Sequence, residues 1–343
     1  MQKTGLLMIL CVFSLSCELI SPGSASNLKT EGVFIVNEGS FLQGNGDVSF
    51  YNSETGQLTN SLFQAANGEA AGDILQCLVP ADSLVILVVN NSNRLRIVRA
   101  ADFKLIKNLS VNQPRFGALA AQGRVYVTCW DGFVRVLDLV TLTISDSIVV
   151  GPYPEDIVAY HDRAYVANSG FGSSNTITII NTSTQQLEGT LVTGYGPVDL
   201  VLDHDADRLY VACTGDAYAS PKVPGGIYVF RESTMEVVDS VITVGNDTIF
   251  PSKIAVLDNH IFFIDGFAGS ITVFDALLHL PVDTLVGNFY RVELNMENQS
   301  DKQVYATTSA APGVLKIFDE NRVETFSGGV GDFPGGIAFK NTR

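Results

Sequence analysis

A phrase of about forty residues that recurs along the chain predicts an all-β fold, a seven-bladed β-propeller with four antiparallel strands in each blade. Three observations support this fold class: the recurring phrase, the alternation of apolar and polar residues within it, and the incomplete copies at the two chain ends. Propeller blades stack around an axis because a single four-stranded sheet cannot bury both of its faces.

Each copy of the repeat begins with a turn and an apolar strand, passes through a polar turn, and reaches a strand of the type YVAN. A third strand follows, as in GFVRVLD, NTITIIN and GSITVFD, and a fourth strand such as ISDSIVVG completes the unit. Six copies contain all four strands, and they start at or near Gly72, Pro114, Pro154, Pro197, Pro251 and Tyr290. These copies predict six complete blades.

The two ends of the chain together predict the seventh blade. The last copy, PGGIAF at 334–339, contains only an innermost strand, and the segments 31–37, 46–52 and 56–63 supply three more. A ring that both termini close leaves no open strand edge, which is a common site of aggregation. Residues 31–343 are therefore expected to form one domain.

Residues 1–17 have the pattern of a secretory signal, with an apolar segment that is too short to span a bilayer. The last four, SLSC, resemble a bacterial lipobox apart from Ser14, where leucine is usual. We expect lipidation of Cys17, a flexible tether over residues 18–30, and an exported protein anchored to the outer membrane at the surface of a Gram-negative bacterium. The alternative is an ordinary signal peptide cut further along, at SAS, which leaves the protein periplasmic or secreted.

Composition excludes some classes of partner. The chain carries a formal net charge of −15 at pH 7 with a pI near 4.6. Nucleic acids bind basic surfaces, so we expect no nucleic-acid partner. The same acidity disfavours docking on anionic membranes, which leaves the lipid anchor as the expected membrane contact.

Three cysteines of the predicted domain, Cys77, Cys129 and Cys213, lie in apolar strand-like segments. Their odd number and their spacing argue against a disulfide framework and against a metal site. We therefore expect small buried hydrophobic side chains, with no metal and no cofactor. The segment DHDADRL at 203–209 begins like a calcium loop, but it lacks the glycine and the distal glutamate and predicts a β-turn.

The predicted topology gathers aromatic residues on one face of the ring. The loops between second and third strands, and those that lead to the next blade, share a face that we call the upper face. Trp130, the only tryptophan, stands at the tip of such a hairpin. The candidate ligand-binding residues are Phe41, Asn91, Arg115, Trp130, Tyr153, Phe171, Tyr195, Tyr218, Phe250, Phe267, Tyr290 and Phe333. A surface of aromatic rings with an amide and a cation suits a large, planar, amide-bearing molecule or a sugar. The alternative is that the rings fill gaps between blades.

The predicted positions of the histidines argue against catalysis on the upper face, where a hydrolase or lyase needs a general base or a metal ligand. The topology places all four in turns of the opposite face: His161, His204, His260 and His279. The upper face offers carboxylates as acid–base groups instead: Glu38, Asp131, Glu155 and Asp216. Acidic loop residues more often form turns, so we expect a protein that is not an enzyme.

The strands YVTC, YVAN and YVAC resemble the repeats of the YVTN (YncE-like) β-propeller family over nearly all of residues 31–340. The segments VNEGSF, VVNNSNRLRIV and GDFPGGIAF more narrowly resemble exported bacterial propeller lipoproteins of the BtuG, cobalamin-capturing type. The resemblance implies capture of a small molecule, cobalamin or a related corrinoid, as a transported ligand for a TonB-dependent outer-membrane transporter. It also implies a protein that is monomeric apart from the transporter.

Two other functions stay open on the sequence alone. One is a propeller hydrolase or lyase of the lactonase kind that uses the upper-face carboxylates, and the other is a protein-interaction scaffold of the cell envelope. The repeats maintain blades rather than chemistry, so they specify the fold more closely than the ligand.

Overall fold

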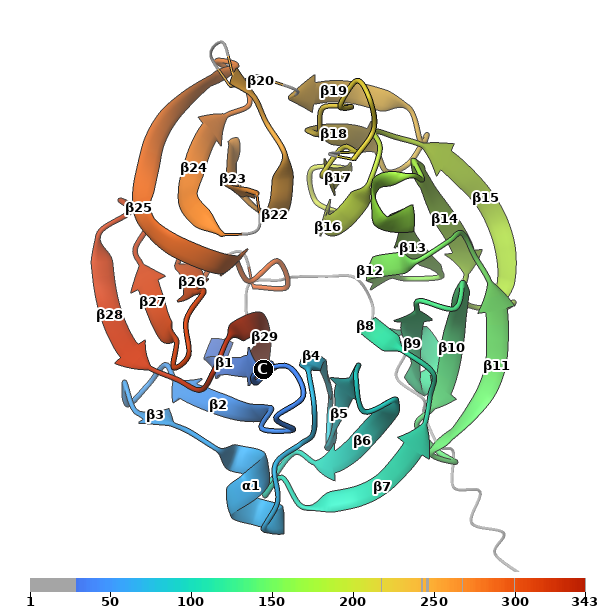
Figure 1. Ribbon diagram of the computed structural model, residues 1–343, viewed down its shortest axis with the longest axis vertical. Coiled ribbons are helices and arrows are strands. Elements are labelled where there is room, and N and C mark those ends of the chain that lie inside the picture. Colours follow the sequence, from blue (N-terminus) through green and yellow to red (C-terminus); the bar gives the residue numbers. More distant parts are fainter. Residues whose placement is uncertain are drawn as a thin grey trace, which may run out of the picture.

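The computed structural model describes residues 29–216, 218–241, 243–244, 247–266, 268–298 and 300–342. Antiparallel sheets are arranged in a ring, and in each four-stranded sheet one end strand lies nearest the central axis while the others follow toward the rim (Figure 1). The predicted all-β propeller with four-stranded antiparallel blades is therefore confirmed.

Five sheets of the ring have four strands each, which follow one another from the axis outward. The first sheet contains, in that direction, β29 (Pro334–Thr342), β1 (Lys29–Asn37), β2 (Asp47–Asn52) and β3 (Leu58–Thr59). The second contains β4 (Leu75–Ala81), β5 (Leu84–Val89), β6 (Arg94–Arg99) and β7 (Leu105–Ser110). The third contains β8 (Pro114–Ala120), β9 (Arg124–Cys129), β10 (Phe133–Asp138) and β11 (Thr143–Val149).

The fourth and fifth sheets continue the same order around the ring. The fourth contains β12 (Pro154–Tyr160), β13 (Arg163–Asn168), β14 (Thr176–Asn181) and β15 (Gln186–Val192). The fifth contains β16 (Pro197–Asp203), β17 (Arg208–Cys213), β18 (Gly226–Arg231) and β19 (Val237–Val241). A short hairpin of β20 (Thr243–Val244) and β21 (Asp247–Thr248) follows it.

The prediction of seven separate four-stranded blades is wrong, because the described residues form five such sheets, one seven-stranded sheet and the two-stranded hairpin of β20 and β21. The seven-stranded sheet contains β22 (Pro251–Leu257), β23 (His260–Asp265), β24 (Gly269–Asp275), β25 (Leu280–Glu293), β26 (Val304–Thr308), β27 (Val314–Phe318) and β28 (Glu324–Gly329). It covers the part of the ring where two blades were predicted.

The seven-stranded sheet arises from the length of β25, which has 14 residues. Its first part pairs with β24 and its last part pairs with β26, so one strand serves as both an outer and an innermost strand. The residue before other innermost strands often turns the chain with a positive φ, as Gln113, Tyr153 and Gly196 do. No residue from 280 to 293 has a positive φ, and the backbone therefore stays extended through this connection.

The first sheet joins the two ends of the described chain, as the sequence predicts. β1 pairs antiparallel with β29, from Lys29 opposite Thr342 to Asn37 opposite Pro334. β1 begins at Lys29, two residues inside the segment expected to be a tether. Cys17 and the rest of that segment lie outside the described residues. Within the described part of the chain, no helix is long and apolar enough to cross a membrane.

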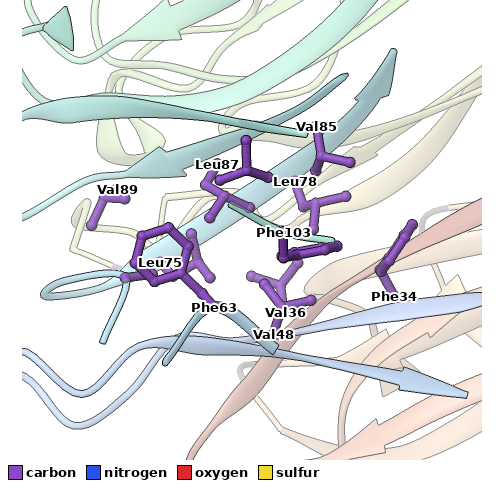
Figure 2. Packing of buried hydrophobic residues seen from close by; sticks show 12 residues of the cluster. Phe34, Val36, Val48, Phe63, Leu75, Leu78, Val85, Leu87, Val89 and Phe103 are labelled. Atoms are coloured by element: carbon purple, nitrogen blue, oxygen red, sulfur yellow. The ribbon is translucent and has the colours of Figure 1, made fainter. Parts of the chain in front are cut away.

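The outer strand of the first sheet also departs from prediction. A strand was expected over residues 56–63, but β3 has two residues and the chain then forms the helix α1 (Leu62–Asn67). The Asp47 carboxylate accepts hydrogen bonds from the backbone N–H groups of Phe63, at 2.9 Å, and Gln64, at 3.1 Å. These bonds satisfy two of the free donors of the first helical turn. The Phe63 ring is fully buried among residues of two neighbouring sheets (Figure 2).

The hydrophobic core is divided among the contacts between neighbouring sheets. In the cluster of Figure 2, Phe34, Val36 and Val48 of the first sheet pack against side chains of the second. The prediction of buried cysteines is confirmed for Cys129 and Cys213, whose burial raises the pKa of each thiol to about 12. Cys77 is only half-buried, and burial of its thiol raises the pKa to about 11.

Candidate ligand-binding site

One end of the ring axis holds a cavity of about 200 Å³. Its walls come mainly from the first residues of innermost strands, and the loops after β1 and β17 add one residue each. These positions place the cavity at the upper face. The lining residues are Glu38, Gln76, Arg115, Phe116, Glu155, Val198, Thr214, Ser252, Lys253, Tyr290 and Gly335.

A sequence rule places several of these residues. The strands β8, β12, β16, β22 and β29 each begin at a proline, and the residue directly after that proline lines the cavity. Those residues are Arg115, Glu155, Val198, Ser252 and Gly335. Proline donates no backbone hydrogen bond and is tolerated at the first residue of a strand, so it marks where each innermost strand begins.

Irregular pairing explains why consecutive residues reach the same cavity. Arg115 and Phe116 both line it, as do Ser252 and Lys253, although side chains of a regular strand alternate between two faces. The register shifts at these places, between Pro114 and Gly117 in β8 and between Pro251 and Lys253 in β22. Bulges of this kind redirect side chains and are common next to functional sites.

Arg115 and Glu155 form a hydrogen-bonded ion pair in the cavity wall. The Nε and Nη2 atoms of Arg115 donate to Oε2 of Glu155 at 3.0 and 2.7 Å, and Nη1 donates to Gln76. The other carboxylate oxygen of Glu155 accepts from Nε1 of Trp130 at 2.9 Å. The Arg115 guanidinium lies 4.3 Å from the centroid of the Trp130 ring, which is within cation–π range. Trp130 is therefore fixed to the cavity wall.

Two exposed rings, Phe171 and Tyr153, extend outward from Trp130, and we call these three residues the ring cluster. The Phe171 ring meets the Trp130 ring at a centroid distance of 5.1 Å and the Tyr153 ring at 4.1 Å. Phe171 is 53% exposed and Tyr153 is 41% exposed, so the pair presents an apolar surface to solvent. Phe171 has a φ of +52°, a conformation that bulky side chains rarely adopt. Such strained positions are found preferentially at binding sites.

A second group of charges faces the axis from β12, β16, β22 and β25. The Oδ1 atom of Asp199 accepts from Nζ of Lys253 at 3.2 Å and from Nη1 of Arg291 at 3.1 Å. Arg291 also pairs with Glu293, through Nε at 2.6 Å. Burial raises the pKa of Asp156 to about 6, and repulsion by Asp199 adds to the effect. Burial likewise raises the pKa of Glu293 to about 7 although Arg291 opposes it.

Glu38 reaches the cavity from the end of β1. Its carboxylate accepts a hydrogen bond from the Gln76 amide at 3.2 Å and from the Tyr290 hydroxyl at 3.3 and 3.4 Å. Burial raises the pKa of Glu38 to about 6, although the nearby Arg115 and Lys253 cations lower it. A methyl group at Gly335 would collide with this carboxylate, so glycine there provides the room that Glu38 occupies.

The predicted ligand-binding residues fall into two groups. The structure brings five of them to the cavity or to the ring cluster beside it: Arg115, Trp130, Tyr153, Phe171 and Tyr290. The others are not joined to that group by any ring contact among the described residues: Phe41, Asn91, Tyr195, Tyr218, Phe250 and Phe333. Asn91 instead hydrogen-bonds Asp73, and Tyr218 is 93% exposed. Phe267 and Cys17 lie outside the described residues.

Sequence reasoning missed much of the polar lining. It did not identify Gln76, Ser252 or Lys253, and it considered Glu38 and Glu155 only as acid–base groups. The position after each strand-initial proline was a usable signal for Arg115, Glu155 and Ser252. The repeat topology did place Glu38 on the upper face, but no signal in the sequence indicated the room that its carboxylate occupies beside Gly335.

None of the four histidines lines the cavity. His161, His204 and His279 lie in connections of the opposite face, as predicted, and His260 is the first residue of β23, next to such a connection. His161 and His204 each stand 4.0 Å from the ring of Tyr160. Across the described segments from 29 to 342, no group of three or more potential metal-ligating residues is found.

A second, more open hollow of about 260 Å³ lies at the opposite end, where β1 begins. Its polar groups largely bond to one another: Thr30 donates to Asp301 at 2.7 Å, and Asn298 donates to Thr30 at 3.1 Å. The Tyr305 hydroxyl adds bonds to Asp301 and Gln303. Because these groups are already paired, the axial cavity is the better candidate site.

The ring of sheets and the lined axial cavity define this protein as a β-propeller with a candidate small-molecule site at one end of its axis. The chain belongs to the family described as Domain of unknown function (DUF5074), whose model matches residues 31–214. Among curated protein sequences, no match is found.

Two solved structures are similar to this chain in fold. One is hydrazine synthase from Kuenenia stuttgartiensis, with 17% identity, a TM-score of 0.61, and coverage of 76% of this chain and 87% of that one. The other is U3-55K, with 10% identity, a TM-score of 0.60, and coverage of 81% of this chain and 86% of that one. At such low identity the likeness concerns the propeller fold alone.

Proposed function

We propose that this protein is a non-catalytic binding protein that captures a small molecule at the upper face, over the axial cavity. The observation that carries the proposal is the ring cluster of Trp130, Phe171 and Tyr153, which is exposed on one side and fixed to the Arg115–Glu155 pair on the other. Rings held in one conformation lose little entropy on binding, which makes them effective contact residues.

In the cell, we propose that the protein is an exported lipoprotein, anchored through Cys17, that passes its ligand to a TonB-dependent outer-membrane transporter. The signal-like residues 1–17 and the resemblance to YVTN-repeat and BtuG-type propellers support this role. The same resemblance makes cobalamin, or a related corrinoid, the first ligand to test. The exposed pair of rings suits the stacking of a large planar molecule.

Catalysis by a propeller hydrolase is the second candidate function, because of Glu38. This carboxyl group lines the cavity, and burial raises its pKa to about 6. A carboxyl group with a raised pKa in a cleft is a candidate general acid or base. Turnover of a lactone that Glu38→Gln abolishes would favour this function over capture.

Calorimetric titration with cyanocobalamin and with a panel of sugars and planar aromatic compounds tests the proposal. We expect Phe171→Ala to weaken binding of the ligand by roughly 30-fold, which corresponds to a contact residue worth about 2 kcal/mol. Tyr160→Ala, which removes a ring at the opposite face, is the matched control and should bind as the wild type does. Normal binding by Phe171→Ala and Tyr153→Ala together would contradict the proposed site.

A further inference from the structure

We propose that the axial cavity binds the ammonium group of a cationic ligand, with the Glu38 carboxylate as its counter-charge. This inference rests on the proposed capture at the upper face, and it assigns the cavity a ligand class other than the corrinoids, which have no ammonium group. It derives from the balance of charges around the axis, from the free hydrogen-bonding capacity of Glu38, and from the rings in the cavity wall.

Carboxylates outnumber cations around the cavity and the axis below it. Five carboxylates face this region: Glu38, Glu155, Asp156, Asp199 and Glu293. Three cations face it: Arg115, Lys253 and Arg291. The ion pairs are Arg115 with Glu155, Lys253 with Asp199, and Arg291 with Asp199 and Glu293. Two carboxylates thus have no cation within 4.0 Å among the described residues, namely Glu38 and Asp156.

Of these two carboxylates, Glu38 is the one that lines the cavity. It is 8% exposed, and its hydrogen bonds come from two neutral donors, the Gln76 amide and the Tyr290 hydroxyl. All these bonds are long, between 3.2 and 3.4 Å. A carboxylate has about four lone-pair sites, so acceptor capacity is left for an ammonium group with its three donors.

Aromatic rings of the cavity wall favour a cation as well. Phe116 and Tyr290 both line the cavity, and the Phe116 ring already lies 5.2 Å from Nζ of Lys253. The electron-rich faces of such rings attract an ammonium group. An anionic ligand would meet fewer free hydrogen-bond donors in the cavity. The Arg115 donors are directed at Glu155 and Gln76. The Lys253 ammonium group donates to Asp199.

Binding of a cation through Glu38 should depend on pH. Burial raises the pKa of Glu38 to about 6, while Arg115 and Lys253 and the hydrogen bonds from Tyr290 and Gln76 lower it. The carboxylate is therefore largely neutral at pH 5 and charged at pH 8. An ammonium ligand should bind more tightly as the pH rises through this range.

Fluorescence of Trp130 gives a direct measurement, because it is the only tryptophan of the chain and contacts the cavity-lining Glu155. The probes are benzylamine and its neutral analogue benzyl alcohol, titrated against the full-length protein at pH 5 and pH 8. We expect benzylamine to bind at least tenfold more tightly than benzyl alcohol at pH 8, and this preference to disappear at pH 5.

Three variants connect the preference to Glu38. Glu38→Gln keeps the size of the side chain and should remove the preference at pH 8. Gly335→Ala should weaken it, because the added methyl group displaces the carboxylate. Glu54→Gln, at an exposed position paired with Lys29, is the control and should leave it unchanged. Melting curves of all three show whether the variants are folded.

Several results would overturn the inference. These are the absence of a saturable response to benzylamine, equal binding of the two probes at pH 8, and a preference that persists in folded Glu38→Gln. Equal binding of both probes that Phe171→Ala weakens would leave the proposed capture function in place and reject only the ammonium site. Unimpaired binding of both probes in Phe171→Ala, with the preference intact, would reject the ring cluster instead.

Discussion

Replacement of Asp156 by asparagine tests whether the charges around the axis destabilise the fold. The Asp156 side chain is buried in β12, and its Oδ2 atom accepts a hydrogen bond from the backbone N–H of Leu200 at 2.9 Å. Asparagine has nearly the same shape and offers a carbonyl oxygen to that N–H. The substitution therefore removes the charge while it keeps the hydrogen bond.

The expected magnitude follows from the pKa of Asp156. Burial, with repulsion from Asp199, raises this pKa from 3.8 to about 6. Between these two values the folded state holds more protons than the unfolded state, so the free energy of unfolding decreases as the pH rises. Above pH 6 the full cost applies, and the difference in pKa corresponds to at most about 3 kcal/mol. We expect Asp156→Asn to be more stable than the wild type by about 1–3 kcal/mol at pH 8.

Urea unfolding of both proteins at pH 5 and pH 8 measures this difference. The stabilisation by Asp156→Asn should be smaller at pH 5, where the wild-type carboxyl group is largely protonated. Asp138→Asn is the control, because Asp138 is the half-buried last residue of β10, and hydrogen bonds from Thr141 and Val140 lower its pKa. It should show no stabilisation at pH 8.

A lower stability of Asp156→Asn at pH 8 would refute this reasoning. It would mean that attraction to Arg291 and Lys253 outweighs the burial of the carboxylate and its repulsion by Asp199. A stabilisation of equal size at both pH values would point to altered packing rather than to charge.

Three further changes have defined outcomes. Trp130→Ala should lower the stability by about 2 kcal/mol and weaken ligand binding, because it removes the bond to Glu155 and the stacking on Arg115; normal binding with early melting would contradict the site. Deletion of residues 334–343 removes the partner of β1 and should abolish cooperative unfolding, whereas an unchanged melting temperature would argue against ring closure. Cys17→Ala should release the protein from the membrane fraction, and membrane retention would contradict lipidation.

The ring architecture was predictable from the sequence because each repeat carries its own strands and turns. The departures arise where contacts between repeats decide the structure. The helix α1 depends on Asp47, which lies in a different strand, and on a buried position for Phe63 between two sheets. The merged seven-stranded sheet depends on an extended connection at residues 280–293, where the repeat pattern predicted a break.

Apart from Arg115 and Tyr290 in the cavity wall, the candidate site was predictable only in its outer part. Exposed rings in loops can be identified from the topology, and Trp130, Phe171 and Tyr153 do form a cluster. The charged lining lies at bulges, where strict alternation of side chains fails, so the pattern gave no reason to place Lys253 and Ser252 in one cavity. The repeat placed Glu38 on the upper face, whereas the fit of its carboxylate beside Gly335 depends on tertiary packing.

Two carboxylates at the axis, Glu38 and Asp156, should both lower the stability, but only Glu38 should contribute to binding. Burial raises the pKa values of Glu38, Asp156 and Glu293, so the ionised form of each is a cost to the folded protein. Proteins keep destabilising groups most often where function requires them. Glu38 lines the cavity and Asp156 does not, although both lack an ion-pair partner among the described residues. Glu38→Gln should therefore raise the stability at pH 8 and remove the preference for amines, whereas Asp156→Asn should raise the stability and keep that preference. Loss of the preference in both variants would show that the excess negative charge of the axis, rather than contact with Glu38, attracts the ligand.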